Sequence, residues 1–490
     1  MMVSESDITK YIYSILQTTP KLSENYIMPY GNILPHRSPY VKIKQFIDDF
    51  LNSEKGKPVE RWLVLPGLRG TGKTTLIFQM YDYLRTETHV KNEDFLYLSA
   101  SDVRTYLDIG IRDIILYYLK EIHRTTPVNL DKKIFIFIDE AHFDPKWEET
   151  IKMLYDRTVG NDNLFFVVTG SSSISLEMST DSVRRRKKHS ILPMNLQEYI
   201  KLKYKKFPPH GTSEFIRNVI FNGDEISFNN HYENEKKLFR KMTELPNPLD
   251  VELKDFIFHG GFPFAINMDP FLIYEKIAEL VDKIICDDLS LIYHYKTGSR
   301  IDITKILIFL ALKLAGEVSQ PKLSRNLQIP LARVNQTLDA LEKTHLLFSL
   351  KPYEGPSGMI RDAWKYYFLS STIKASLLHK YGRLDRTDNI MFGELVENAV
   401  ISAFFRMMKT IDKPTGIFYD PGKGGVDFLL TYGEKVIPVE VCCGKKDKKQ
   451  THRTSKRIRK VKHKIIISNE EKSKQEDDVY YIPLKTFLFS

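Results

Sequence analysis

Cysteine is scarce in this chain. It occurs at Cys286, Cys442 and Cys443 among 490 residues. Three thiols at this spacing supply neither a disulfide framework nor a set of zinc ligands. We therefore expect reduced, buried thiols and a fold held together by its hydrophobic cores.

Long apolar runs are also missing. The longest, residues 306–316, is interrupted by Lys313 and is too short to cross a bilayer. The first seven residues are polar and acidic, unlike a secretory signal peptide. No internal repeat or low-complexity tract is visible. These absences predict a cytoplasmic protein that does not contact a membrane.

The chain is long enough for several domains, and its basic charge is concentrated in one of them. At 490 residues, two to four domains are expected. Residues 445–464 contain eleven Lys or Arg and one Asp, which equals the net charge of +10 of the whole chain. A basic patch of this kind predicts contact with a polyanion such as DNA. A solvated basic helix without a partner is the alternative.

A phosphate-binding loop occupies residues 67–74, which read Gly-Leu-Arg-Gly-Thr-Gly-Lys-Thr. In the pattern G-x-x-x-x-G-K-[ST], the glycines let backbone N–H groups turn toward an anion. The Lys73 ammonium would reach the β- and γ-phosphates, and the Thr74 hydroxyl would hold Mg²⁺. A strand-like run precedes the loop and a helical pattern follows it, as the motif requires. The predicted nucleotide ligands are Gly67, Gly70, Thr71, Gly72, Lys73, Thr74 and Thr75.

Two carboxylates follow the apolar run at residues 134–138. Asp139 is expected at the carboxyl edge of a parallel sheet, where such folds bind ligands, and would hold Mg²⁺ together with Thr74. Glu140 would act on the attacking water as a general base or as an orienting group. Lys73, Asp139 and Glu140 are thus the predicted catalytic residues, and an acidic helix cap after an ordinary strand is the alternative.

A further apolar run, residues 164–168, ends in Thr169, Gly170, Ser171 and Ser172. Thr169 and Ser171 are predicted to contact the γ-phosphate or to position the water, and a simple turn is the alternative. The run Arg184–Arg186 has two open interpretations. It is a solvated loop, or it supplies an arginine finger in cis or from a neighbouring subunit. The guanine-reading motif Asn-Lys-x-Asp is absent, which favours ATP over GTP.

The alternation of strands and helices predicts an α/β protein. Apolar runs separated by helices in residues 61–200 indicate a parallel sheet covered on both faces. Residues 210–250 show weak periodicity and are interpreted as an insertion or linker. Three helices and a β-hairpin in residues 302–369 outline a winged helix. The predicted domains are an N-terminal helical segment (1–55), a P-loop ATPase core (56–205), a helical lid or linker (206–300), a winged helix (301–380) and a basic C-terminal α/β domain (385–490).

The phosphate loop, Phe-Ile-Asp-Glu-Ala-His, Thr-Gly-Ser-Ser-Ser and Leu-Pro-Met-Asn-Leu-Gln-Glu-Tyr together resemble a family of AAA-type ATPases of archaea and bacteria. The resemblance also includes Gly260-Gly261-Phe262-Pro263. It implies a winged helix and a C-terminal domain similar to PD-(D/E)XK restriction nucleases. It supports the roles given above to Lys73, Thr74, Asp139 and Glu140, with ATP and Mg²⁺ as cofactors.

The nuclease-like domain implies a second candidate site. Such domains place an acid on a helix, an Asp on a hairpin strand and Glu-x-Lys on the next strand. The residues at these positions are Glu394 and Glu397, then Asp427, then Glu440. These carboxylates are able to gather Mg²⁺ for phosphodiester cleavage. Cys442 occupies the lysine position, so Lys445 or Lys446 would have to replace it; an inactive domain kept for binding is the alternative.

Three functions follow from these features. The first is an ATPase that binds DNA through the winged helix and the basic segment, residues 453–464 especially. The second is an ATP-regulated nuclease. The third is a nucleotide switch that scaffolds a protein partner. The sequence leaves open whether several copies of the chain assemble.

Overall fold

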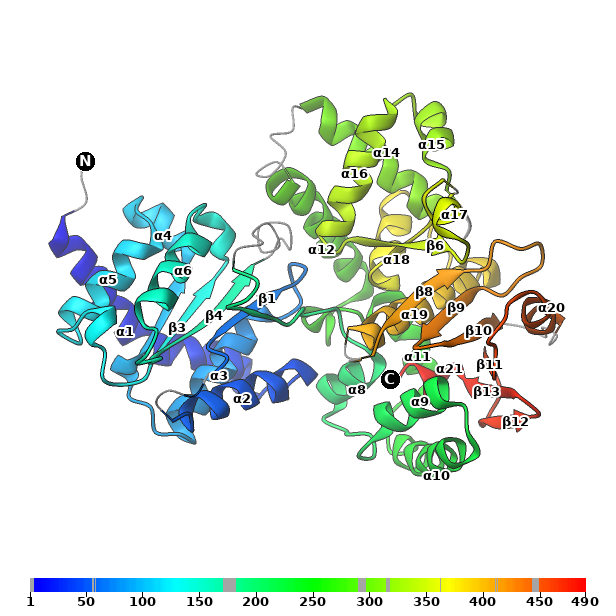
Figure 1. Ribbon diagram of the computed structural model, residues 1–490, viewed down its shortest axis with the longest axis horizontal. Helices are drawn as coiled ribbons and strands as arrows, with labels where there is room; N and C mark the ends of the chain where they lie inside the picture. Colours follow the sequence, from blue (N-terminus) through cyan, green and yellow to red (C-terminus); the bar gives the residue numbers. More distant parts are fainter. Residues whose placement is uncertain are drawn as a thin grey trace. The chain divides into compact units, whose positions relative to one another are not determined.

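The computed structural model describes residues 4–54, 57, 59–170, 182–289, 297–313, 318–361, 363–409, 411, 413–442 and 449–490. The chain divides into two compact units, Met1–Leu192 and Pro193–Ser490. Figure 1 shows the elements of both units. No helix in the described ranges combines the length and the apolar character needed to span a membrane.

Unit 1 is built on a parallel five-stranded sheet in the order β2-β3-β4-β1-β5. Every neighbouring pair in it is parallel. The strands are β1 (Trp62–Pro66), β2 (Phe95–Ser99), β3 (Ile134–Asp139), β4 (Leu164–Gly170) and β5 (Lys187–Lys188). The four apolar runs seen in the sequence thus form β1 to β4, which confirms the predicted parallel sheet.

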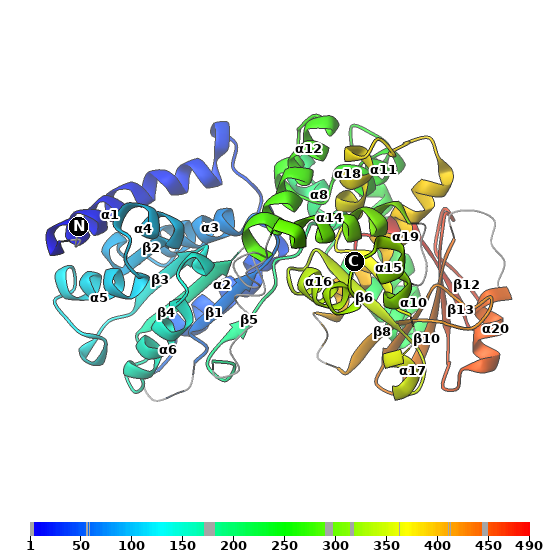
Figure 2. The same cartoon turned by 90° about the horizontal axis from the view of Figure 1, so that it is seen from above.

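Helices cover both faces of this sheet (Figures 1 and 2). They are α1 (Glu5–Ile27), α2 (Ser38–Leu51), α3 (Lys73–Thr86), α4 (Ala100–Leu107), α5 (Ile111–Glu121) and α6 (Trp147–Arg157). Successive side chains of a strand point to opposite faces. In β3, Ile136 therefore packs in the core with α1, α4, α5 and α6, whereas Phe137 packs in the core with α2 and α3. Burial on both faces explains why the strand has no polar residue before Asp139.

Helices are spread along the whole length of unit 2. These are α8 (Leu196–Tyr204), α9 (Thr212–Asn222), α10 (Glu225–Met242), α11 (Leu249–His259), α12 (Pro270–Lys283), α14 (Thr297–Leu312), α15 (Gln320–Leu327), α16 (Leu331–Lys343), α17 (Pro356–Arg361), α18 (Ser371–Lys380), α19 (Asn389–Met408), α20 (Lys449–Arg457) and α21 (Leu484–Phe487). Helices α14 to α16 lie where three helices were expected. Between the two strands of the predicted hairpin the chain forms the short helix α17 rather than a simple turn.

The stretch interpreted as an insertion or linker forms the regular helices α9 and α10. Its weak hydrophobic periodicity arises because α10 buries polar side chains. Glu235 is 2% exposed and accepts hydrogen bonds from the backbone N–H of Ser473 at 2.8 Å and from the Thr486 hydroxyl at 2.6 Å. His231, also buried, bonds the Ser473 hydroxyl at 2.9 Å. These partners lie far along the chain, so a periodicity search based on apolar residues misses the helix.

An eight-stranded mixed sheet forms the second layer of unit 2, in the order β12-β13-β11-β10-β9-β8-β6-β7. Its strands are β6 (Leu347–Pro352), β7 (Lys365–Phe368), β8 (Thr415–Tyr419), β9 (Phe428–Tyr432), β10 (Lys435–Cys442), β11 (Lys464–Ser468), β12 (Lys474–Glu476) and β13 (Val479–Pro483). The predicted hairpin is present as the antiparallel pair β6–β7. Strand β6 also pairs in parallel with β8, so one sheet joins the hairpin to the C-terminal strands.

Candidate functional site

The phosphate loop connects β1 to α3 through a backbone that needs its glycines. Gly70 and Gly72 have φ angles of 77° and 85°, in the left-handed region that favours glycine. Gly67 is required for a different reason, because a Cβ there would lie 2.3 Å from the carbonyl oxygen of Ile191. The loop therefore curls as the motif predicts, and α3 begins at Lys73.

Gly67→Ala is expected to destabilise unit 1, because the backbone of residue 191 must move to admit the new methyl group. We expect a loss of about 1–3 kcal/mol in the free energy of unfolding, as for other overpacked sites. Gly393→Ala is the control, since nothing lies within 4 Å of a Cβ at that position. Chemical denaturation of both variants measures the difference. Equal stability of the two would show that the contact with Ile191 is unimportant.

Side chains inside the loop hold its shape. The Lys73 ammonium, 8% exposed, donates to the carbonyl oxygens of Gly67 at 3.0 Å and Leu68 at 2.8 Å. The Thr71 hydroxyl also donates to the Leu68 carbonyl, at 2.8 Å. Arg37, buried before α2, donates to the Thr71 carbonyl at 2.6 Å and to the Leu192 carbonyl at 2.9 Å. Sequence reasoning missed Arg37, which carries no motif.

The predicted metal ligands meet at the carboxyl edge of the sheet. The Thr74 hydroxyl donates to Oδ2 of Asp139 at 2.6 Å, although the two residues lie on α3 and β3. The Thr169 hydroxyl, at the end of β4, donates to Oδ1 of the same carboxylate. Strand β4 lies between β1 and β3, so it brings Thr169 between the loop and the acidic pair. Three of the predicted side chains thus form one hydrogen-bonded group.

Glu140 follows Asp139 in a backbone conformation unusual for a residue with a side chain, with a φ of 51°. Its N–H donates to Oδ1 of Asp139 at 3.0 Å. Burial raises the pKa of the Glu140 carboxyl above its ordinary value of 4.5, and the neighbouring Asp139 charge raises it further. Hydrogen bonding by Ser101 opposes this shift. A carboxylate with a raised pKa is a better proton acceptor than an ordinary one.

His142 is a further buried group next to this site that the sequence analysis left without a role. It is 7% exposed, and burial lowers the pKa of its imidazole to about 3, with a smaller contribution from the charges of Arg69 and Lys73. The imidazole is therefore neutral at physiological pH. A neutral ring adds no positive charge near the loop lysine, so the cationic character of the site comes from Lys73 and Arg69.

The remaining predicted site residues of unit 1 differ in whether the structure describes them and in the partners they have. Thr75 lies in the first turn of α3, whereas Ser171 and Ser172 lie outside the described residues. In the arginine run, Arg185 pairs with Asp156 at 2.7 Å and Arg186 lies 3.6 Å from Glu148. Arg184 is exposed and has no ion pair in the described ranges. Of the three, Arg184 is therefore the best placed to meet another molecule.

The second candidate site brings three acids close together in unit 2. Asp427, just before β9, accepts from the N–H of Val441 at 2.8 Å, and its own N–H donates to Oε2 of Glu440 at 3.3 Å. Glu440, on β10, is fully buried. Burial and then the Asp427 charge raise the pKa of Glu397 on α19, whose carboxylate accepts from the Tyr367 hydroxyl at 2.7 Å.

The surroundings of this site limit its chemistry. Glu394 is partly buried and pairs with Lys374 at 2.8 Å, whereas Glu397 is the helix acid whose pKa is raised by the Asp427 charge. The side-chain amide of Gln450 on α20 faces Glu440, and with its nitrogen turned toward the carboxylate it donates to Oε2 at 2.8 Å. Within the described ranges, no three His, Cys, Asp or Glu side chains are grouped so as to hold a metal ion. Cys442 is buried in β10, and Lys445 and Lys446 lie outside the described residues.

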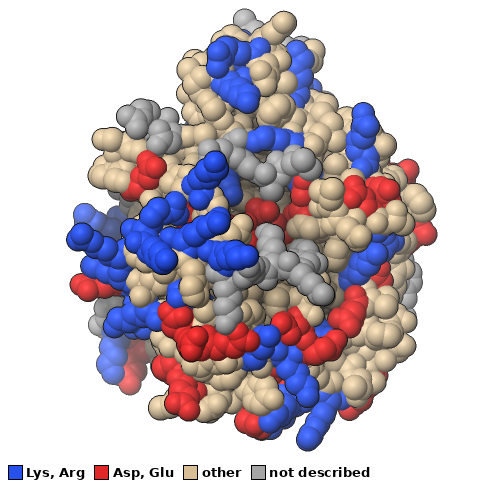
Figure 3. Space-filling view, turned by 90° about the vertical axis from the view of Figure 1, so that its right-hand side faces the viewer, with Lys and Arg blue, Asp and Glu red and all other residues tan. Residues whose placement is uncertain are grey.

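The basic segment is only partly neutralised by acids. Arg457 on α20 donates to Oδ1 of Asp420 at 2.6 Å, and buried Lys464 pairs with Asp478 at 2.5 Å. Lys456 and Arg459 are exposed and have no ion pair among the described residues. Figure 3 shows Lys and Arg side chains gathered on the face of unit 2 that carries α20. The charge excess seen in the sequence is therefore a surface feature.

Two separate parts of the chain match models of known protein domains. Residues 59–200 match the model of an AAA domain, and residues 392–487 match a domain of unknown function, DUF4143. The uncharacterized protein MJ1637 of Methanocaldococcus jannaschii is 31% identical over 484 residues, which cover 98% of this chain and 94% of that protein. This chain belongs to the family of MJ1637. An uncharacterized protein of Haemophilus influenzae is a more distant relative, 22% identical over 77% of this chain and 81% of that protein.

In this member of the MJ1637 family, the match over residues 59–200 supports an AAA-type domain, in agreement with the first part of the predicted resemblance. Solved structures are less similar. The Walker-type ATPase PABY2304 of Pyrococcus abyssi is 12% identical, covers 71% of this chain and 97% of its own length, and has a TM-score of 0.39. The Aeropyrum pernix ORC1 protein, solved with DNA, is 13% identical over 73% of this chain and 96% of its own, with a TM-score of 0.30.

Proposed function

We propose that unit 1 binds ATP together with Mg²⁺ and hydrolyses it. The observation that carries the proposal is the hydrogen bond between Thr74 on the phosphate loop and Asp139 on β3. It places a hydroxyl and a carboxylate together beside a loop that is shaped for phosphates. A hydroxyl and one carboxylate are a donor set that suits Mg²⁺, which takes few protein ligands and keeps several waters.

Each residue of the site has one role in this proposal. Thr74 and Asp139 would hold Mg²⁺, which when bound would neutralise charge on the phosphates. The Lys73 ammonium leaves its two loop carbonyls and binds phosphate oxygens, which stabilises the charge that develops on them. Thr169 holds the orientation of the Asp139 carboxylate through its hydrogen bond. Glu140 accepts a proton from the attacking water or orients it.

The direct test is a titration of the full chain with Mg·ATP by calorimetry, followed by a phosphate-release assay. Mg·GTP serves as the comparison, because the sequence lacks a guanine-reading motif. We expect heat of binding and turnover with ATP, and weaker effects with GTP. Absence of heat with both nucleotides would contradict the proposal, since the loop would then hold no triphosphate.

The basic surface of unit 2 supports a second part of the proposal, binding of DNA. Lys456 on α20 and Arg459 after it are exposed and have no ion pair among the described residues, as expected of a surface that contacts phosphates along a duplex. Helices α15 and α16 with the β6–β7 hairpin supply the elements of a winged helix, which we propose as the contact to the groove.

Replacement of Lys456 and Arg459 by Glu is expected to weaken binding of duplex DNA and to lower its salt dependence. Each phosphate that is no longer neutralised reduces the slope of log K against log salt by about 0.9, so the slope of the double variant should fall by about 1.8. Anisotropy titrations over a range of salt measure the slope. The matched control replaces Lys241 and Lys472, exposed lysines outside the basic segment, by Glu. An equal loss in both double variants would mean that only net charge matters.

The acids of unit 2 favour nuclease activity as a second candidate function. Asp427 contacts Glu440, and its charge raises the pKa of Glu397, so the three acids supply carboxylates of the kind that metal-ion cleavage of phosphodiesters uses. Among the described residues they are not grouped closely enough to hold a metal ion, so cleavage would require them to move together when the ion binds. Incubation of plasmid with the chain, Mg²⁺ or Mn²⁺ and ATP tests this, with Asp427→Ala and Glu440→Ala as controls. Cleavage that is lost in both variants supports a nuclease. Cleavage that survives in both comes from a contaminant.

A further inference from the structure

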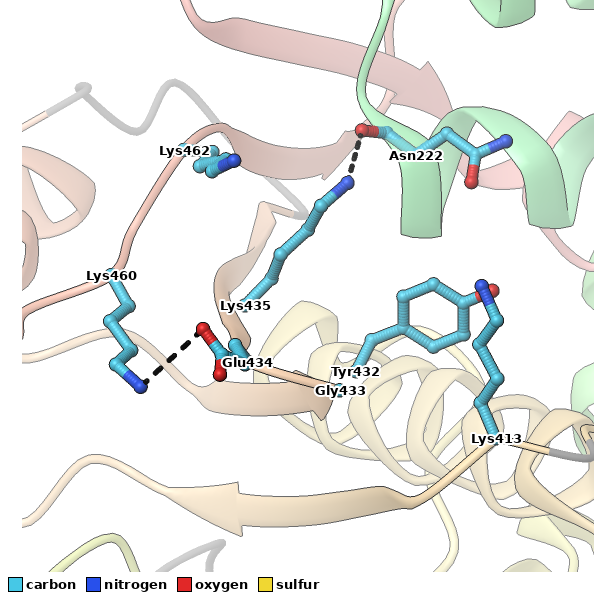
Figure 4. A pocket seen from close by; sticks show the side chains of 8 residues that line it. All are labelled: Asn222, Lys413, Tyr432, Gly433, Glu434, Lys435, Lys460 and Lys462. Carbon is cyan, nitrogen blue, oxygen red and sulfur yellow. Dashed lines mark hydrogen bonds and ion pairs between the residues drawn. The ribbon is translucent and has the colours of Figure 1, made fainter.

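A cavity of about 380 Å³ lies in unit 2 and belongs to neither acidic site. Figure 4 shows its lining residues. They are Asn222, Lys413, Tyr432, Gly433, Glu434, Lys435, Lys460 and Lys462. Four lysines against one glutamate leave a formal charge of +3 around this small space. The volume lies at the lower end of the range of about 300–1,000 Å³ found for small-ligand sites.

Two of these lysines, Lys460 and Lys462, come from one short segment of the chain. Val461 forms a parallel bridge with Val436 of β10, and its side chain packs in a hydrophobic cluster with it. Lys460 and Lys462 stand on either side of Val461, and both line the cavity. The contacts of Val461 thus hold the segment that brings these two cations to the cavity.

The wall opposite is fixed by buried contacts. The Lys435 ammonium donates to the carbonyl oxygens of Asn222 at 3.0 Å and Phe221 at 3.5 Å, at the C-terminal end of α9. The Phe221 ring packs on that of Tyr432, with 5.0 Å between the centroids. The buried ring of His463 bonds the Ile220 carbonyl at 2.8 Å. These contacts fasten the end of α9 to the sheet, so the cavity does not depend on a ligand for its shape.

Three of the cations stay available to a ligand. The Lys435 ammonium already donates hydrogen bonds to the carbonyl oxygens of α9. Lys413, in contrast, lies over the Tyr432 ring, 4.9 Å from its centroid, and has no acid partner in the described ranges. Lys462 is exposed and has none either among those residues. Lys460 approaches Glu434 only at 3.9 Å, and both side chains are mostly exposed. An exposed pair of this kind contributes at most about 1 kcal/mol, so an anion competes with it easily.

We propose that this cavity, the lysine pocket, binds phosphate groups. Lysine ammonium groups bind phosphate as compact point charges. They lack the planar, bidentate geometry with which the arginine guanidinium binds carboxylates. Three available cations in one small cavity suit closely spaced phosphate charges better than the single, more widely spaced charges of an acidic peptide. The phosphates would come either from a nucleic-acid strand lying on the basic segment, which contains Lys460 and Lys462, or from a free polyphosphate. Only the first source rests on the proposed DNA binding.

The test uses the full chain with Lys73→Ala, so that the phosphate loop does not compete for the probe. Pyrophosphate is titrated by calorimetry, and a labelled single-stranded oligonucleotide by anisotropy over a range of salt. Lys413→Gln with Lys462→Gln removes two charges from the pocket, and Lys241→Gln with Lys472→Gln removes two elsewhere as the control. Circular dichroism checks that both double variants remain folded.

We expect the pocket variant to lose at least tenfold in affinity for the probe that occupies the pocket, whereas the control keeps it. If the strand is the source, its salt slope falls by about 1.4, because each phosphate neutralised on a single strand accounts for about 0.7. If only pyrophosphate binding is lost, the source is a free polyphosphate, and the lysine pocket stands even if the chain binds no DNA. Equal binding by the pocket and control variants for both probes overturns the proposal. The proposal is also overturned if a polyglutamate peptide displaces the probe at a lower concentration of charged groups than inorganic phosphate requires.

Discussion

Lys73→Ala is expected to lower ATP turnover by a factor of about 10²–10³ or more, the usual effect of removing one preorganised cationic or hydrogen-bonding group from a transition state. In the free chain the ammonium donates to the Gly67 and Leu68 carbonyls, which hold it inside the loop. Bound phosphates offer it oxygens of full negative charge instead. Alanine has no ammonium group to bind the phosphate oxygens, so the affinity for ATP should weaken together with turnover.

The control for this variant is Lys120→Ala, a change of the same kind on the exposed side of α5. Phosphate release under steady-state conditions and calorimetry with Mg·ATP measure turnover and binding separately. Thermal unfolding of both variants shows whether the loop keeps its structure without the ammonium. Turnover that equals that of the parent chain would rule out the phosphate loop as the site of hydrolysis.

Glu140→Gln is expected to separate binding from hydrolysis. Glutamine keeps the size of the side chain and contacts no phosphate in the proposal, so the affinity for ATP should change little. Turnover should fall by a factor of about 10²–10⁴, the range contributed by a positioned general base. Calorimetry and phosphate release on one protein preparation give both numbers. A variant that hydrolyses ATP at the parent rate would exclude Glu140 as the group that acts on water.

The pH dependence of the parent chain gives an independent check of Glu140. Only the ionised carboxylate accepts a proton, and burial together with Asp139 raises its pKa above 4.5. Turnover should therefore decline as the pH falls through this raised value, at a higher pH than an ordinary glutamate would give. In Glu140→Gln the residual activity should lack this decline. A decline of the same shape in both proteins would assign it to another group.

The nucleotide site could be predicted closely because its parts are local motifs on strands with one polarity. Glycines at residues 67, 70 and 72 impose the loop, and the apolar runs of β1 and β3 place Lys73 and Asp139 at the same sheet edge. The roles of Arg37 and of the sheet neighbour Thr169 depend on packing. No spacing rule connects Arg37 with the carbonyl of Thr71, which it contacts.

Unit 2 was less predictable, because its polar contacts join distant segments. The helix α10 was missed since its buried face carries His231 and Glu235, which find partners near the end of the chain. The β6–β7 hairpin joins the C-terminal strands through the parallel pair β6–β8. No local sequence pattern predicts this pairing. The predicted acids did come near one another, since the hairpin β9–β10 that carries Asp427 and Glu440 is itself a local feature.

The amino-acid sequence by itself determined the phosphate loop, the acidic pair, the parallel strands of unit 1 and the confinement of the basic charge to one segment. These features need only neighbouring residues, because glycine conformations, the period of apolar side chains and charge counts are properties of short stretches of chain. The tertiary structure alone decided that Thr74 touches Asp139, that Glu397 rather than Glu394 stands beside Asp427, and that four lysines from three separate segments line one cavity. Such contacts arise when whole helices and sheets pack, which places residues together that are far apart along the chain.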